Sequence, residues 1–145
     1  MASWRETTTQ QTQDDFEELL NFVLPFAEQL LSKHGELYPF GAVTTVDGEV
    51  EMRAASPQLG DKHPMSAAVL DLLYEGARSD SGALRAVAFV ADVRIEHGNA
   101  IRIDLESTEA AAIQILVPYK RNRLTKKLTV GAMSVHEGKR RVWPA

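Results

Sequence analysis

Apolar and polar residues alternate with period two over residues 84–119, and this is the clearest pattern in the chain. The odd-numbered positions are apolar in three runs, 87–95, 101–105 and 113–119. Because successive side chains of a strand point to opposite faces, the pattern predicts three consecutive antiparallel strands. Turn-forming residues occupy the short connections at 96–99 and 107–109.

The register of these strands follows if all the odd-numbered apolar residues share one face. Directly paired residues lie on the same face, so their numbers must then sum to an even value. A three-residue loop at 97–99 meets this condition and places Ile95 opposite Ile101. The opposite, outer face then carries apolar residues among its charges, namely Ala88, Val90, Ala112 and Leu116.

Two helices are predicted, at residues 13–34 and 64–79. The first has apolar residues at the three-and-four spacing of a buried stripe: Phe16, Leu19, Leu20, Val23, Ala27, Leu30 and Leu31. Pro25 interrupts this stripe, so we expect a kink there or two short helices. Pro64 suits the first position of the second helix. Residues 1–12 are polar without periodicity and are predicted to form a flexible tail.

A β-hairpin is predicted between the two helices, with its turn at Asp47-Gly48. A two-residue turn pairs Thr45 with Val50. Further strands are predicted at 128–135 and 140–143, which gives the order α-β-β-α-β-β-β-β. The sequence therefore predicts a single α+β domain over residues 13–145. It has two layers, one mainly antiparallel sheet of about five or six strands with both helices on one face.

Composition limits the class of protein. The 145 residues are 44% hydrophobic and 25% charged, which is ordinary for a globular domain. The absence of cysteine excludes a disulfide framework, thiolate metal sites and a cysteine nucleophile. No apolar run approaches the roughly 20 residues of a membrane span. We expect a soluble, cytoplasmic protein that does not contact a membrane.

Charge is distributed unevenly along the chain, although the net charge is only −4. Residues 1–118 hold 8 basic against 19 acidic side chains, and residues 119–145 hold 8 basic against one acidic. Two interpretations stay open: the basic end packs against the acidic body, or it binds anions. The candidate anion-binding residues are Lys120, Arg121, Arg123, Lys126, Lys127, Arg140 and Arg141.

Candidate catalytic and metal-binding residues are few. The four histidines fall at helix ends and turns, where a structural role suffices, so neither a metal site nor a cofactor is predicted. His136-Glu137 begins like a zinc-protease motif, but Arg140 stands where the second histidine is required. We name no catalytic residue, and an enzyme acting on a small molecule is the least supported class.

One resemblance covers nearly the whole chain after the first residues. The segment Gly-Glu-Leu-Tyr-Pro-Phe-Gly-Ala at 35–42, the Asp-Gly-Glu at 47–49 and residues 101–106 resemble a family of small bacterial proteins with no known activity. The resemblance implies a bacterial protein. It implies no catalytic residue, cofactor or substrate.

The apolar residues on the predicted outer face carry the leading hypothesis. A face of this kind suits burial against another subunit. The sequence thus favours a non-enzymatic protein-interaction domain that self-associates through its sheet, as a homo-oligomer or with a protein partner. The alternative is an anion-binding or nucleic-acid-binding protein that uses the basic C-terminal end. Few aromatic residues flank that end and the whole chain is acidic, so nucleic acid is not favoured.

Overall fold

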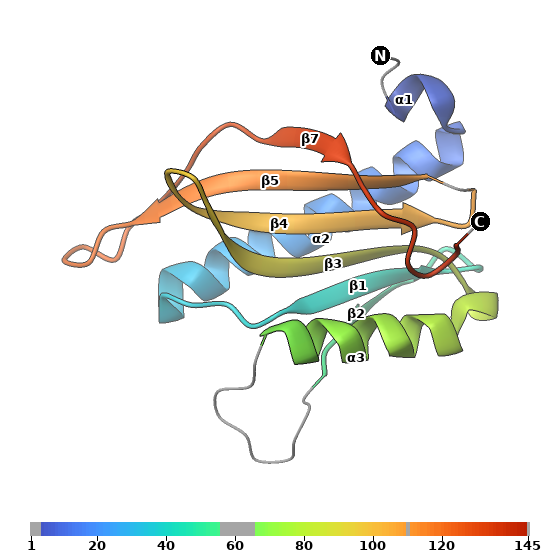
Figure 1. Cartoon of the computed structure of the whole chain (residues 1–145), viewed down its shortest axis with the longest axis horizontal. Helices are drawn as coiled ribbons and strands as arrows, with labels where there is room; N and C mark the ends of the chain where they lie inside the picture. The colour runs from blue at the N-terminus through green and yellow to red at the C-terminus, as the bar shows by residue number, and fades with distance from the viewer. Residues whose placement is uncertain (1–3, 56–65, 110, 145) are drawn as a thin grey trace.

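The sheet organises the fold in the computed structural model, which describes residues 4–55, 66–109 and 111–144. Its strands run antiparallel in the order β2-β1-β3-β4-β5-β6, and β7 pairs with β5 (Figure 1). Their bounds are β1 (Phe40–Thr45), β2 (Val50–Arg53), β3 (Leu84–Ile95), β4 (Gly98–Ser107), β5 (Ala112–Arg121), β6 (Leu128–Val130) and β7 (Ser134–Glu137). The predicted α+β class and the meander at its centre are confirmed.

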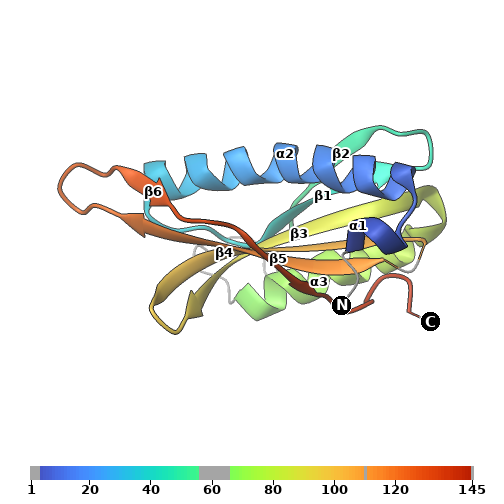
Figure 2. The ribbon, with the colours of Figure 1, turned by 90° about the horizontal axis from the view of Figure 1, so that it is seen from above.

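The two long helices lie on opposite faces of the sheet (Figure 2). α2 (Gln10–His34) covers one face, and α3 (Ser66–Ser79) packs on β1 and β3 of the other. The prediction that both helices lie on one face is therefore wrong. A short helix, α1 (Trp4–Thr7), precedes α2, and a 3-10 turn, η1 (Ser81–Ala83), follows α3.

The turn between β3 and β4 explains this difference. Ile95 pairs with Gly98, so the turn has two residues, and the predicted pairing of Ile95 with Ile101 is wrong. As a result Val90 lies opposite Ile103, and both side chains face α2. The even-numbered residues of β3 thus join the odd-numbered residues of β4 and β5 in one core.

β3 is apolar on both faces because helices cover both of them. Ala88 and Val90 are buried under α2, while Val87 and Phe89 are buried under α3. A central strand covered on both sides has a nearly continuous apolar run rather than an alternation. Its sequence therefore contains no signal that assigns its residues to one face or the other.

The β1–β2 turn also differs from its prediction. Thr44 lies opposite Val50, and the Thr45 N–H donates to the Glu49 carbonyl at 2.8 Å. The loop therefore has three residues, 46–48, and Gly48 takes a φ of 89° at its end. Asp-Gly suits this arrangement as well as a two-residue turn, because a glycine at the left-handed position closes both.

α2 is a single helix through Pro25 rather than two short ones. It begins earlier than predicted, because the Thr9 hydroxyl oxygen accepts the Thr12 N–H at 3.2 Å and caps it. The residues before it, predicted to be a flexible tail, include α1, whose Trp4 ring lies 5.6 Å from the ring of Phe16. The predicted apolar stripe is confirmed at its buried positions: Phe16, Leu19, Val23, Ala27 and Leu31.

The C-terminal segment, residues 138–144, is irregular rather than the predicted strand at 140–143. It returns across the α3 side of the sheet, where Val142 is buried in the cluster formed by α3, β1 and β3. The region predicted as one strand at 128–135 contains β6 and the start of β7. Pro64, the predicted first residue of the second helix, lies outside the described residues.

Candidate functional site

The α3 side of the sheet carries a row of polar side chains beyond the helix. Asp104 of β4 pairs with Gln114 of β5, and Gln114 pairs with His136 of β7. The Gln114 side-chain amide donates to an oxygen of Asp104 at 3.1 Å. α3 packs on β1 and β3, so these polar residues lie beside the helix rather than beneath it.

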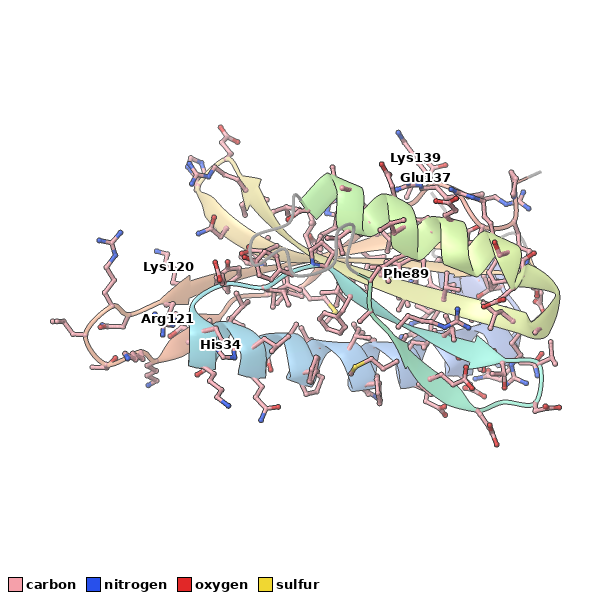
Figure 3. The ribbon with its side chains drawn as sticks, turned by 90° about the horizontal axis from the view of Figure 1, so that it is seen from below. His34, Phe89, Lys120, Arg121, Glu137 and Lys139 are labelled. Atoms are coloured by element: carbon pink, nitrogen blue, oxygen red, sulfur yellow. The ribbon has the colours of Figure 1, made fainter. Side chains whose placement is uncertain are left out.

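A cavity of about 350 Å³ lies where this row meets α3 and the C-terminal segment. Its volume is within the range of small-ligand sites. The lining comes from α3, β4, β5, β7 and the segment that follows: Tyr74, Arg102, Asp104, Gln114, Glu137, Gly138, Lys139 and Arg141. Figure 3 shows Glu137 and Lys139 on this side of the molecule.

Arg102 is one of the three cations that line this cavity. Its Nε lies 3.2 Å from an oxygen of Asp104 but is buried without a hydrogen bond to any described residue. The other oxygen of Asp104 accepts from Gln114. The Asp104 carboxylate is therefore shared between two neighbours and leaves the guanidinium of Arg102 incompletely satisfied.

Tyr74 and Arg141 form one wall. The guanidinium carbon of Arg141 lies 3.7 Å from the centre of the Tyr74 ring, a cation–π contact, and Asp71 lies 3.5 Å from one of its nitrogens. Burial raises the pKa of Tyr74 far above its usual value, and the charge of Asp104 adds to this rise while Arg141 opposes it. The phenol is therefore neutral at ordinary pH and available as a hydrogen-bond donor.

Glu106 fixes the position of the C-terminal segment. Glu106 is 3% exposed, and its carboxylate accepts backbone N–H groups of Arg141, Val142 and Trp143 at 2.7 to 3.0 Å. This hydrogen bonding satisfies a buried charge and orients Arg141 toward the cavity. The sequence does not reveal this role, because the backbone groups that bond Glu106 lie 35 to 37 residues further along the chain. In the sequence Glu106 looks like one of several solvated charges along the strand.

The interaction face predicted from the sequence does not exist as one surface. Ala88 and Val90 are fully buried under α2. Ala112 and Leu116 are half-buried on the opposite face, where they pair with Glu106 and Arg102 of β4. The two-residue turn between β3 and β4 separates the two pairs, so they cannot meet one partner together.

The predicted anion-binding residues divide between two ends of the molecule. Four lie exposed on the hairpin that joins β5 and β6: Lys120, Arg123, Lys126 and Lys127. Arg121 turns toward the end of α2, where it donates to the Ser32 carbonyl at 3.3 Å, and Figure 3 shows it near His34. Arg140 and Arg141 belong to the C-terminal segment, where they directly follow Lys139, which is labelled in Figure 3.

Ion pairs do not tie the hairpin to the acidic body. Among the described residues, Arg141 pairs with Asp71, but the four exposed hairpin cations take part in no ion pair. The interpretation that the basic end packs against the acidic body thus fails for the hairpin. In the described part of the C-terminal segment, Arg141 does form such an ion pair, with Asp71.

β7 is an edge strand, because among the described strands it pairs with β5 alone. The Gly138 N–H donates to the Ala112 carbonyl at 3.1 Å, which fixes the hydrogen-bonded pairs of the β5–β7 ladder. Because such pairs alternate along antiparallel strands, the backbone groups of Val135 and Glu137 point away from β5. Exposed apolar side chains lie along the same edge: Val130 (41%), Met133 (44%) and Val135 (48%).

The three histidines that the structure describes do not converge. His34 ends α2, His97 lies in the β3–β4 turn, His136 is on β7 with its Nε2 2.8 Å from the Ser134 hydroxyl, and His63 lies outside the described residues. Within residues 4–55, 66–109 and 111–144, no group of three or more metal-ligating side chains gathers. No helix in the same described ranges is long and apolar enough to cross a membrane.

A comparison with known proteins finds no matching family model, no significantly similar curated protein and no significantly similar solved structure. The resemblance of residues 35–42 and 47–49 to a bacterial family therefore stays a prediction. Function is inferred from the geometry and charge of the features above.

Proposed function

We propose that this protein is a non-enzymatic protein-interaction domain that self-associates through the β7 edge of its sheet. The outward-facing backbone groups of Val135 and Glu137, beside exposed apolar side chains, are the observation that carries this proposal. The partner surface thus differs from the face predicted from the sequence, while self-association through the sheet is retained.

The chemistry of an unpaired edge supports this choice. A strand edge with free N–H and C=O groups is a template for another strand, and apolar side chains beside it add burial. A two-fold axis at β7 pairs the strand with its own copy in antiparallel fashion and continues the sheet across both subunits. Val135 and Met133 then exchange exposure to water for contact with the partner.

A charge at the edge tests the proposal. Val135→Lys places an ammonium group where the second strand would pack, a device that natural edge strands use to prevent pairing. In light scattering the native protein is expected as a dimer and this variant as a monomer. The matched control is Val46→Lys in the β1–β2 turn, because Val46 is similarly exposed at 54% and lies far from β7 in the sheet order.

A second variant separates the backbone from the side chain. Val135→Pro removes an N–H that points outward and leaves the N–H groups that bond β5 in place. It should also give a monomer, with an unchanged circular dichroism spectrum. A monomeric native protein at every concentration, or a dimer that survives both variants, rejects the proposal.

A second function, binding of a polyanion, is favoured by the β5–β6 hairpin. The hairpin extends beyond the body of the molecule (Figure 1). Its tip is ordered by Asn122, whose side-chain oxygen accepts the N–H groups of Leu124 and Thr125 at 2.8 and 3.0 Å. Four exposed cations without ion pairs surround this tip, which is the charge pattern that phosphate groups attract.

A further inference from the structure

We infer that the cavity between α3, β4, β5 and the C-terminal segment binds the oxyanion group, carboxylate or phosphate, of a small ligand. Its walls come from parts of the chain far apart in sequence, from Tyr74 to Arg141. The folded structure, rather than one loop, therefore builds this site. The inference does not depend on self-association through β7.

Charge within the cavity favours an anion. Three cations, Arg102, Lys139 and Arg141, face two carboxylates, Asp104 and Glu137. Both oxygens of Asp104 are already engaged, one by Gln114 and the other by Arg102. Asp71, which lies outside the lining, pairs with Arg141, so among the described residues Lys139 is the lining cation that takes part in no ion pair. A ligand that enters from solvent meets this charge together with the two paired guanidinium groups.

Arg102 is the first of the two arginines of the proposed site. Within the described residues its buried Nε lacks a hydrogen bond, although Asp104 lies 3.2 Å away. A guanidinium offers five N–H donors in a planar fork that matches a carboxylate or phosphate. The Arg102 side chain is 27% exposed although its Nε is buried, so an oxyanion in the cavity would meet the terminal nitrogens of this guanidinium.

Arg141 is the second arginine of the proposed site. Its backbone N–H donates to Glu106 at 2.9 Å, and its guanidinium lies over the ring of Tyr74. The ring contact restricts this side chain before a ligand arrives, which lowers the entropy cost of binding. Asp71, its ion-pair partner, is 74% exposed and is weak competition.

The size of the cavity selects among anions. A volume of about 350 Å³ accommodates a small metabolite. A nucleic acid or a folded partner is too large to enter. The expected ligand is a small organic carboxylate or phosphate ester whose charged group lies between Arg102 and Arg141.

The test is an NMR titration of the full chain with inorganic phosphate and, separately, with acetate, at an ionic strength held constant with chloride. Saturable shifts are expected for the backbone amides of Arg102, Gln114 and Gly138 and for the Gln114 side-chain amide. A response to phosphate alone or to acetate alone supports the inference and identifies the oxyanion.

Variants of the lining residues test whether the probe binds in the cavity. Arg102→Gln should weaken binding roughly tenfold, since it removes a charged hydrogen-bond donor. Arg94→Gln is the control, because Arg94 is an exposed arginine on the neighbouring strand β3. If Arg102→Gln does not fold, Lys139→Gln, at an exposed position of the rim, replaces it and should also weaken binding.

Three results overturn the inference. One is the absence of saturable shifts with either probe. Another is a response confined to residues 120–127, which would mean an adventitious ion only. The third is equal affinity in the native protein and in the cavity variants.

Discussion

At the scale of single residues, Asp92 and Tyr119 form a short hydrogen bond with a consequence for pH. The Tyr119 hydroxyl donates to an oxygen of Asp92 at 2.6 Å. Burial raises the pKa of Asp92, and the bond from Tyr119 opposes this rise without cancelling it. The folded protein therefore holds the Asp92 proton more tightly than the unfolded chain does.

Asp92→Asn should change how stability depends on pH. Because the pKa of Asp92 is raised on folding, its contribution is most favourable below the usual aspartate pKa and is lost as pH rises through the raised value. The free energy of unfolding of Asp92→Asn, minus that of the native protein, should thus increase from about pH 3 to about pH 7. Urea unfolding at a series of pH values measures it.

Asp47→Asn is the control for this experiment, because Asp47 lies exposed in the β1–β2 turn, where asparagine is equally suitable. Its difference from the native protein should vary less with pH. A constant difference for Asp92→Asn, or one that decreases as pH rises, would show that burial of Asp92 does not control its ionisation.

At the scale of elements, the close approach of β1 and β3 depends on Gly41. A Cβ atom at this position would lie 2.4 Å from a ring carbon of Phe89 and 2.7 Å from the Ala88 carbonyl oxygen. The carbonyl belongs to the strand ladder and cannot move aside without lengthening backbone hydrogen bonds. Glycine is needed here for space rather than for an unusual φ.

Substitution of two glycines tests this packing. Gly41→Ala should destabilise the fold by about 1 to 3 kcal/mol, because the added methyl overpacks the strand pair. Gly76→Ala lies on the exposed side of α3, where the new methyl meets no atom within 4 Å beyond its chain neighbours and its own helix backbone, and it should stabilise the fold by about 0.5 to 1 kcal/mol. Denaturant midpoints measure both. Equal midpoints for Gly41→Ala and the native protein would contradict the close approach.

The elements also show how far the sequence predicts this fold. Periodicity predicts the meander and the stripe of α2, since each is a local pattern. It does not predict which side of β3 faces which helix, because residues 86–91 are apolar throughout. Because one residue more or less in a turn exchanges the two faces of a strand, the three-residue turn predicted at 97–99 places Ala88 and Val90 on an exposed surface.

The candidate cavity was equally hidden from sequence patterns. Arg102 and Asp104 look like an ordinary alternation of charges on a wet strand. Their environment is set by Tyr74 and by the segment that Glu106 holds, both distant along the chain. Local periodicity identifies strands and helices. A site assembled from segments that are far apart in the sequence leaves no pattern within any one segment.

At the scale of the whole molecule, the basic charge that the sequence concentrates in residues 119–145 is separated in space. The β5–β6 hairpin holds its exposed cations at one end, and Arg140 and Arg141 lie with the C-terminal segment. On α2, Asp14, Glu17 and Glu18 line a separate acidic surface. A polyanion would therefore meet favourable charge at the hairpin and repulsion from α2, which orients the contact.

The hairpin alone should then account for any binding to a nucleic acid. A labelled DNA duplex, followed by fluorescence anisotropy over a series of salt concentrations, should bind with an affinity that falls steeply as salt increases. The double variant Arg123→Gln, Lys127→Gln should lower the slope of log affinity against log salt by about two, one for each lost cation.

Arg94 is an exposed arginine outside the hairpin, so Arg94→Gln should leave the slope of log affinity against log salt unchanged. Arg121 is a poor choice for such a test, since it donates to the end of α2 and its loss would disturb the fold. Absent binding at low salt, or a slope that the double variant does not alter, removes the polyanion function. Because none of these substitutions touches β7, the result also leaves the test of self-association intact.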